Sequence, residues 1–197
     1  MSNSNLRSEL RSHRRSLTPD QQLDAANRIA DAFFRLDLHI DITRIGLYWP
    51  NDGEIDPRVL MQRLMDAGKA CYLPILHPKK ENALCFGEYS TSSAMTKNRY
   101  GIEEPTNTNT IEALSLDLIL IPLVGFDDSG NRLGMGAGYY DRTLASAAAL
   151  SDNEPRTPSL IGLAHSCQRV DAIEAQPWDI PMHAILTDQD FIKIQRD

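Results

Sequence analysis

The chain of 197 residues is long enough to bury a hydrophobic core without disulfide bonds, and its length favours a single domain over residues 1–197. Its hydrophobic fraction of 42% and charged fraction of 24% are ordinary for a globular protein, and no apolar run is long enough to span a membrane. The net charge of −7 argues against nonspecific nucleic-acid binding, which requires a basic surface.

The N-terminal part of the chain predicts two helices. Leucines separated by arginines over 6–17 predict a short amphipathic helix. The next helix has a clear start signal, with Thr18 as N-cap, Pro19 at the first position and Gln21 completing a capping box. An Arg- and Ser-rich start is also compatible with a transit peptide, but Glu9 and the immediate run into a second helix favour a folded segment.

The rest of the chain alternates short apolar runs with helical patterns. Strands are expected at 44–49, 69–76, 83–89, 116–126, 159–165 and 184–187, and helices at 55–68 and 139–150. Asp56 is expected to cap the first of these helices, Pro57 to occupy its first position and Gly68 to end it. This layout predicts an α/β fold with a largely parallel central sheet flanked by helices.

Three segments lie outside that alternation. Residues 151–158 predict a surface loop, and 188–195 a terminal turn or a short helix. Residues 90–116 are mostly polar and predict a long excursion, of the kind that is usually functional or mobile; the sequence leaves open whether 90–109 form a lid.

The segment RLGMGAGYYD, residues 132–141, is the most unusual part of the chain. Its alternating glycines, Gly134, Gly136 and Gly138, have neither the spacing of a dinucleotide fingerprint nor the lysine of a P-loop. A plain turn explains one or two glycines but not three. Backbone N–H groups freed by glycine, the start of a helix and Arg132 together favour an anion, so we predict a phosphate-binding site.

The residues that follow the glycines allow two interpretations each. Tyr139 and Tyr140 point in different directions on a helix, so one of them is expected to face the ligand. Asp141 lies in the first turn, where it either compensates the helix dipole or holds Mg²⁺ beside a triphosphate.

The longer segment PLVGFDDSGNRLGMGAGYYDRTL, residues 122–144, resembles the signature of the 5-formyltetrahydrofolate cyclo-ligase family, also called 5,10-methenyltetrahydrofolate synthetases. Other blocks resemble the family in the same order, at 6–21, 51–76, 100–105 and 162–187. The resemblance implies a three-layer α/β fold with a largely parallel central sheet, Rossmann-like and of the NagB/RpiA/CoA-transferase-like kind.

The resemblance also implies the reaction. ATP phosphorylates the formyl oxygen of 5-formyltetrahydrofolate, N10 attacks the activated carbon, and 5,10-methenyltetrahydrofolate, ADP and phosphate result. The protein then has mainly to align two substrates and neutralise charge. The alternative is a noncatalytic member of the same fold family that binds folate or nucleotide.

Site residues follow from the resemblance, position by position. The implied ATP-binding set is Arg7, Arg132, Leu133, Gly134, Met135, Gly136, Ala137, Gly138, Tyr139 and Tyr140. Arg132 and Tyr140 are the implied catalytic residues. The implied folate-binding set is Trp49, Glu54, Met135, Gly136, Ala137, Gly138 and Tyr139. Asp141 and Asp179 would hold Mg²⁺.

Each assignment outside the glycine stretch has a simpler alternative. A carboxylate suits the paired donors of a pterin, but Glu54 also fits a solvent-facing strand end. Trp49 also fits the core, Arg7 a solvated charge and Asp179 a turn before a proline. Asn3 stands where the family often has a basic residue, so one phosphate contact is expected to be missing or supplied by Arg11, which would weaken ATP binding without abolishing it.

The expected partners are small molecules only: ATP and 5-formyltetrahydrofolate, with or without a polyglutamate tail, and neither nucleic acid nor membrane. Three cysteines, Cys71, Cys85 and Cys167, are too few and too scattered for a disulfide framework. We therefore expect a cytoplasmic protein, and a monomer.

Overall fold

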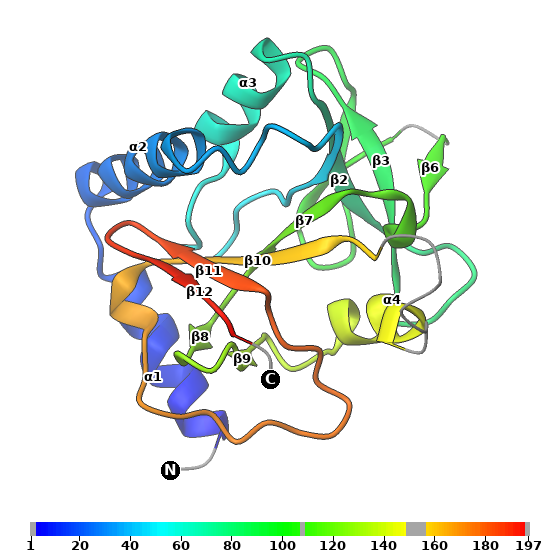
Figure 1. Ribbon diagram of the computed structural model, residues 1–197. Coiled ribbons are helices and arrows are strands. Elements are labelled where there is room, and N and C mark those ends of the chain that lie inside the picture. Colours follow the sequence, from blue (N-terminus) through cyan, green and yellow to red (C-terminus); the bar gives the residue numbers. More distant parts are fainter. Residues whose placement is uncertain (1–2, 107–108, 149–156, 196–197) are drawn as a thin grey trace.

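A sheet of eight strands forms the centre of the computed structural model, which describes residues 3–106, 109–148 and 157–195 (Figure 1). The strand order is β12-β11-β10-β7-β1-β2-β3-β6. The strands are β1 (Arg44–Gly46), β2 (Ala70–Leu76), β3 (Leu84–Tyr89), β6 (Thr110–Ile111), β7 (Leu118–Pro122), β10 (Ser159–Ala164), β11 (Ala184–Thr187) and β12 (Phe191–Lys193). Strands β11, β10, β7, β1 and β2 are parallel, while β12, β3 and β6 add antiparallel edges, so the predicted largely parallel sheet is confirmed.

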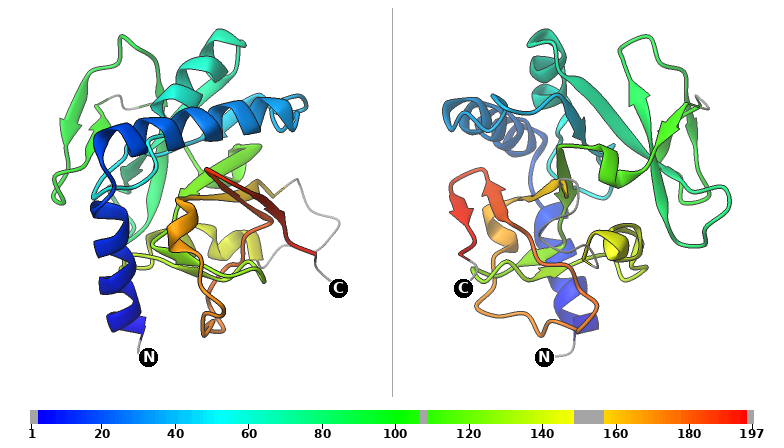
Figure 2. Two further views of the ribbon diagram at one scale, coloured as in Figure 1. Left: turned by 90° about the vertical axis from the view of Figure 1, so that its left-hand side faces the viewer. Right: turned by 45° about the vertical axis from the view of Figure 1, so that its right-hand side comes forward.

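Helices cover both faces of this sheet, as the two views of Figure 2 show. Helices α2 (Pro19–Arg35) and α3 (Arg58–Asp66) pack on one face, and α4 (Tyr139–Ala148) packs on the other. The central strand β7 serves both layers, because Leu118 and Leu120 join the α2–α3 cluster while Ile119 and Ile121 join the cluster that contains Leu144 of α4.

Local signals account for the start of α2 and the end of α3. The Thr18 hydroxyl accepts from the Gln21 N–H at 3.2 Å and the Gln21 side chain accepts from the Thr18 N–H at 2.8 Å, which confirms the capping box. Helix α3 ends before Gly68, whose φ of +75° suits glycine. The predicted start was one residue early: Pro57 is the N-cap rather than the first helical residue, although the Asp56 carboxylate does accept from the Arg58 N–H.

Three other segments differ from the prediction. The run 116–126 is not one strand: β7 ends at Pro122, and Gly125–Phe126 form β8, which belongs to a separate two-stranded sheet. The turn or short helix expected at 188–195 is wrong, because Phe191–Lys193 forms β12 and pairs antiparallel with β11. The excursion at 90–116 contains secondary structure of its own: a hairpin of β4 (Met95–Lys97) and β5 (Glu103–Pro105), then β6 and the short 3₁₀ helix η1 (Ala113–Ser115). Most of the loop expected at 151–158, and the last two residues of the helix expected at 139–150, lie outside the described residues.

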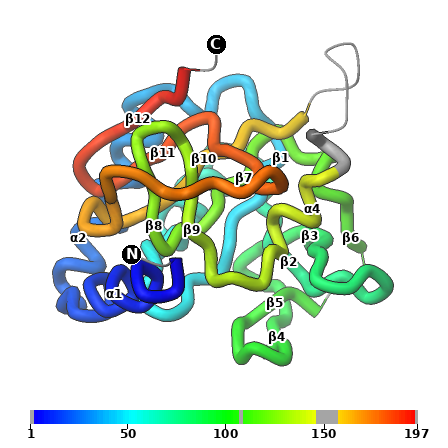
Figure 3. The backbone as a smooth tube through the Cα atoms, turned by 90° about the horizontal axis from the view of Figure 1, so that it is seen from below, coloured from blue at the N-terminus to red at the C-terminus, as the bar shows by residue number. Residues whose placement is uncertain are grey.

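The N-terminal helix and a short hairpin lie in the lower half of Figure 1. Helix α1 (Asn3–Arg15) packs Leu10 against Val124 and Leu133. Val124 directly precedes β8 (Gly125–Phe126), and Leu133 belongs to β9 (Arg132–Leu133), which pairs with β8 as a hairpin. The 3₁₀ helix η2 (Ser166–Gln168) follows β10 and contacts α1. Figure 3 shows the chain from β9 to α4 lying between α1 and the β4–β5 hairpin. Among the described residues, no helix has the length and apolar character needed to cross a membrane.

Candidate active site

A cavity of about 990 Å³ lies at the carboxyl ends of the parallel strands. Its walls include Trp49 beyond β1, Pro74 in β2 and Pro122 at the end of β7. This is the place where open α/β sheets bind ligands. All residues assigned from the resemblance line it: Arg7, Trp49, Glu54, Arg132, Leu133, Gly134, Met135, Gly136, Ala137, Gly138, Tyr139, Tyr140, Asp141 and Asp179.

Two of the three glycines have a backbone reason to be glycine. Gly136 has φ of +98° and Gly138 has φ of +66°, conformations that side chains disfavour. A Cβ at Gly138 would also lie 2.8 Å from the Arg142 guanidinium, which donates to the carbonyl of Ala137. Gly134 is different, because it has no such φ and nothing lies within 4 Å of a Cβ placed there. Its open surroundings leave backbone exposed to the cavity.

Arg7 lies against this glycine stretch. Its Nε donates to the carbonyl oxygen of Gly134 at 2.7 Å, and its Cζ lies 3.7 Å from where a Cβ of Gly136 would be. Helix α1 therefore brings a cation to the glycines from a distant part of the sequence, and Arg7 is not simply a solvated charge. Asn3, one helical turn earlier, also lines the cavity.

Arg132 and Asp141, one on either side of the glycine stretch, form a part-buried ion pair that also lines the cavity. The Arg132 side chain is only 6% exposed; its guanidinium contacts Asp141 and also donates to the carbonyl of Ile180. Asp141 accepts a second hydrogen bond, from the Ile180 N–H at 3.2 Å. The pair thus ties β9, α4 and the segment before β11 together, and a guanidinium with five donors retains others for a ligand.

Asp141 and Asp179 are the candidate ligands for Mg²⁺. Both line the cavity, and Asp179 also accepts from the Gln176 N–H at 2.8 Å. Within the described part of the chain, no group of three or more His, Cys, Asp or Glu side chains is arranged to hold a metal. Two carboxylates nevertheless fit Mg²⁺ that is also bound by phosphate oxygens, which is how this ion commonly binds in proteins.

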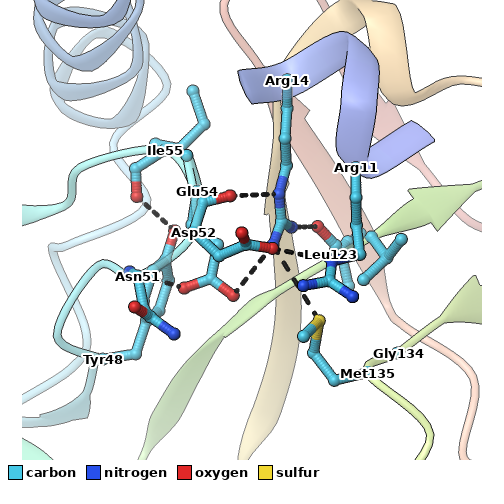
Figure 4. Close-up of polar contacts among 12 residues, drawn as sticks. Arg11, Arg14, Tyr48, Asn51, Asp52, Glu54, Ile55, Leu123, Gly134 and Met135 are labelled. Atoms are coloured by element: carbon cyan, nitrogen blue, oxygen red, sulfur yellow. Dashed lines mark hydrogen bonds and ion pairs between the residues drawn. The ribbon is translucent and has the colours of Figure 1, made fainter. Parts of the chain in front are cut away.

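Glu54, in the turn after β1, is a further acidic group that lines the cavity (Figure 4). Its side chain is 12% exposed, it accepts from the Asn51 N–H at 3.0 Å, and the Arg14 guanidinium lies 3.7 Å away. Burial raises the pKa of Glu54 to about 7, and the positive charge of Arg14 opposes that rise. Glu54 is therefore not a solvent-facing strand end, but a carboxyl group poised to change its charge near neutral pH.

Trp49 combines both roles that the sequence allowed. Its ring packs edge-to-face on Tyr89 at 5.9 Å, and the Arg58 guanidinium lies 5.3 Å from its centre. It packs against the core cluster of the α2–α3 face and also lines the cavity. It is thus held firmly enough to offer a flat wall to a ring.

The two tyrosines of α4 face different neighbours. The Tyr139 hydroxyl lies 2.8 Å from that of Tyr100 and accepts from Arg99, both in the β4–β5 hairpin. Burial raises the pKa of Tyr140, as does the nearby charge of Glu54. Tyr140 therefore keeps its proton at neutral pH and can donate a hydrogen bond into the cavity.

Sequence reasoning missed Arg14, the only charged side chain among the largest fully buried ones of the described residues. Arg7, Leu10 and Arg14 follow the spacing i, i+3, i+7, so they share one face of α1, and the apolar Leu10 was the available signal that this face is buried. Asp52 was also missed; its carboxylate binds Arg11 and Arg14 (Figure 4) and also Arg15.

Comparisons with known proteins confirm the resemblance to a known family. Residues 1–188 match the 5-formyltetrahydrofolate cyclo-ligase family. The chain is 38% identical to the 5-formyltetrahydrofolate cyclo-ligase of Haemophilus influenzae, over 92% of this chain and 95% of that protein. It is 37% identical to that of Escherichia coli K12, over 90% and 96%. The structure superposes on 5,10-methenyltetrahydrofolate synthetases of Aquifex aeolicus (TM-score 0.83, 24% identity, covering 100% of this chain and 95% of that one) and Mycoplasma pneumoniae (0.74, 26%, 95% and 99%).

Proposed function

Since the chain belongs to the 5-formyltetrahydrofolate cyclo-ligase family, we propose that it is an enzyme that converts 5-formyltetrahydrofolate and ATP into 5,10-methenyltetrahydrofolate, ADP and phosphate. The observation that carries the assignment is that one cavity is lined both by the glycine stretch with its arginines and by a mostly buried carboxyl group with an aromatic ring. Such a cavity suits a polyphosphate and a pterin at the same time.

The chemistry requires activation of an amide. The γ-phosphoryl group of ATP is transferred to the formyl oxygen, N10 attacks the formyl carbon and loses its proton, and the carbon–oxygen bond breaks to release phosphate. Backbone N–H groups of 134–138, the start of α4 and the cations Arg7 and Arg132 would bind the phosphates. Tyr140, which keeps its proton, would donate to an oxygen that gains charge.

The folate would occupy the part of the cavity that Glu54 and Trp49 line. Glu54, as a carboxylate, would accept from the amino group and ring N–H of the pterin, and Trp49 would lie against its ring. Residues Met135–Tyr139 would contact both substrates. Asp141 and Asp179 would hold Mg²⁺, which when bound neutralises phosphate charge. The protein's main contribution is thus to hold two reactants in one geometry.

Several finer properties belong to the same proposal. We place the enzyme in the cytoplasm, supported by three cysteines that are all free thiols. Action as a monomer on a folate with a polyglutamate tail, and one domain over residues 1–197, remain predictions.

The test is a direct assay. Purified protein with MgATP and 5-formyltetrahydrofolate is expected to produce the absorbance of the methenyl product together with stoichiometric phosphate. Glu54→Gln is expected to raise KM for the folate more than KM for ATP. A folded protein that binds both compounds yet releases neither product would support the noncatalytic alternative.

A further inference from the structure

Arg14 is a buried cation that lies outside the set of residues assigned to either substrate. Its side chain is 0% exposed, and burying a guanidinium is costly unless its donors are satisfied. Its Nε donates to the backbone carbonyl of Asp52 at 2.8 Å and its Nη2 to the Asp52 carboxylate at 3.0 Å. Its Nη1 donates to the carbonyl of Leu123, just beyond β7, at 3.0 Å. These hydrogen bonds offset the free-energy cost of burying the guanidinium.

The same guanidinium also reaches both walls of the cavity (Figure 4). Its Nη2 lies 3.7 Å from Oε1 of Glu54 and 4.0 Å from Sδ of Met135 in the glycine stretch. One planar group therefore contacts the turn after β1, the end of β7 and the glycine stretch. These are the three segments whose relative placement sets the distance between the proposed folate and phosphate sites.

The turn that Arg14 holds has an unfavourable backbone. Asp52 has φ of +55° and Gly53 has φ of +75°, so both adopt the left-handed conformation, which costs free energy for a residue with a side chain. External contacts maintain it: the Gln22 amide donates to the carbonyls of Arg14 and Gly53 at 3.1 and 3.3 Å, and the His165 ring lies 3.2 Å from the Gly53 carbonyl. The position of Glu54 thus depends on contacts from outside the turn, including those of Arg14, as well as on the hydrogen bond from the Asn51 N–H within it.

We propose that Arg14 is a positioning residue, which fixes the Asp52–Glu54 turn relative to the glycine stretch so that the folate and the phosphoryl group meet in line. The proposal rests on the proposed function, in which Glu54 binds the folate. Phosphoryl transfer followed by ring closure demands such alignment, since a displacement of about 1 Å can cost a hundredfold in rate.

The charge of Arg14 adds a second effect. Its guanidinium favours the carboxylate form of Glu54, the form that accepts hydrogen bonds from the pterin. The titratable and charged groups that face Glu54 are Arg14 and Arg11 of α1, Asp52 of the same turn, Tyr48 after β1 and Tyr140 of α4. Arg14 is the fully buried cation in this set, so its removal should change the pH dependence of folate binding.

The central experiment uses Arg14→Lys, which keeps a positive charge but cannot form the planar fork. We expect KM for the folate to rise about tenfold, because a charge-assisted bond that positions Glu54 is lost. We expect kcat to fall as well, and KM for ATP to change less than about threefold, since Arg7 and Arg132 remain. A merely structural role would lower the amount of folded enzyme and leave KM unchanged.

Arg15→Ala is the matched control. Arg15 also binds the Asp52 carboxylate from α1, but its side chain is 53% exposed and no contact links it to Glu54 or Met135 in the described structure. We expect Arg15→Ala to keep both KM values and kcat within about twofold of wild type, as is usual for exposed ion pairs. If Arg15→Ala raised the folate KM as much as Arg14→Lys does, the proposal would be overturned. Loss of any arginine that binds Asp52 would then explain the rise in KM.

A double-mutant cycle separates this proposal from the function on which it rests. If Arg14 acts through Glu54, Arg14→Lys will raise the folate KM much less in Glu54→Gln than in wild type. Additive effects would overturn the positioning role but leave Glu54 as a folate ligand. If Glu54→Gln alone leaves the folate KM unchanged, the folate role of Glu54 is itself wrong, and the positioning role fails with it.

Two further variants keep the test decisive if Arg14→Lys does not fold. Asp52→Asn keeps Arg14 but weakens its hydrogen bond to the turn. It is therefore expected to raise the folate KM, as Arg14→Lys does. Arg14→Met removes the charge, so the pH at which folate binding weakens is expected to rise relative to wild type, measured by equilibrium binding of 5-formyltetrahydrofolate. A folded Asp52→Asn with wild-type folate KM would contradict the proposal.

Discussion

At the scale of residues, Glu54 is subject to two opposing influences on its ionisation. Burial raises its pKa from 4.5 to about 7, and Arg14 limits that rise. Because this pKa is higher in the folded state than in the unfolded chain, the ionisation of Glu54 lowers the unfolding free energy as pH rises. The protein keeps its full stability with respect to this group below pH 4.5 and loses part of it as pH rises through about 7. A binding carboxylate is thus maintained in the folded protein at the expense of its stability, a common property of active sites.

The replacement Glu54→Gln tests this linkage. Glutamine resembles the protonated form, so we expect the variant to match the wild type near pH 4.5 and to exceed its unfolding free energy at pH 8 by up to about 3 kcal/mol. Urea unfolding at the two pH values measures the difference. Glu9→Gln, at an exposed position of α1, is the control and is expected to change stability by less than about 0.5 kcal/mol. A pH-independent gap between wild type and Glu54→Gln would contradict the assignment.

Asp141 has a structural role as well as a proposed role toward Mg²⁺. It neutralises Arg132, whose side chain is 6% exposed, so Asp141→Asn is expected to lower stability by about 1–3 kcal/mol. If Asp141 also binds Mg²⁺, the Mg²⁺ concentration needed for half-maximal rate will rise. Asp128→Asn removes an exposed ion pair with Arg169 and is expected to change neither quantity appreciably. An unchanged Mg²⁺ dependence in Asp141→Asn would leave only the structural role.

At the scale of elements, the glycine stretch between β9 and α4 divides into positions that need glycine for different reasons. Gly136 has a positive φ and Arg7 beside it, so Gly136→Ala is expected to cost about 1–2 kcal/mol of stability. Gly134→Ala meets no neighbouring atom and has no such φ, so its unfolding free energy is expected to stay within about 1 kcal/mol of wild type. Thermal unfolding of both variants checks this, and equal destabilisation would show that the backbone explanation is wrong.

Elements with local start and stop signals were predictable from the sequence, and those set by distant contacts were not. Thr18, Pro19 and Gln21 define the start of α2 through bonds within four residues. In contrast, β12 exists because Phe191–Lys193 pairs with β11, a contact that the pattern of 188–195 does not reveal. Pairing also divides the excursion at 90–116 into short strands.

At the scale of the whole molecule, the same distinction applies to the site. Residues of the glycine stretch are contiguous, so the motif alone predicted that they lie together, and they do line one cavity. The burial of Arg14 was not, because its acceptors at Asp52 and Leu123 lie 38 and 109 positions away. Sequence showed four arginines near the start of the chain, and only tertiary structure distinguishes the one that is buried from those at the surface.

The two walls of the cavity predict how ligands stabilise the molecule. A ligand that binds only the folded state raises the unfolding free energy by about 2.7 kcal/mol at a concentration of one hundred times its Kd. We expect both MgADP and 5-formyltetrahydrofolate to raise Tm of the wild type. At the same ligand concentrations, Glu54→Gln is expected to reduce the folate shift and keep the nucleotide shift. Loss of both shifts together would mean that the two ligands do not occupy separate walls.

Helix α1 is synthesised well before the segments that it contacts, because its Arg14 bonds to the carbonyl of Leu123 and contacts the sulfur of Met135, 109 and 121 positions later. During synthesis this guanidinium must therefore remain hydrated until most of the chain has emerged. Docking of α1 is expected to be a late step of folding, slowed by the length of the loops that it closes. The proposed pocket for two substrates is consequently completed only when α1 meets segments that are synthesised more than a hundred residues later.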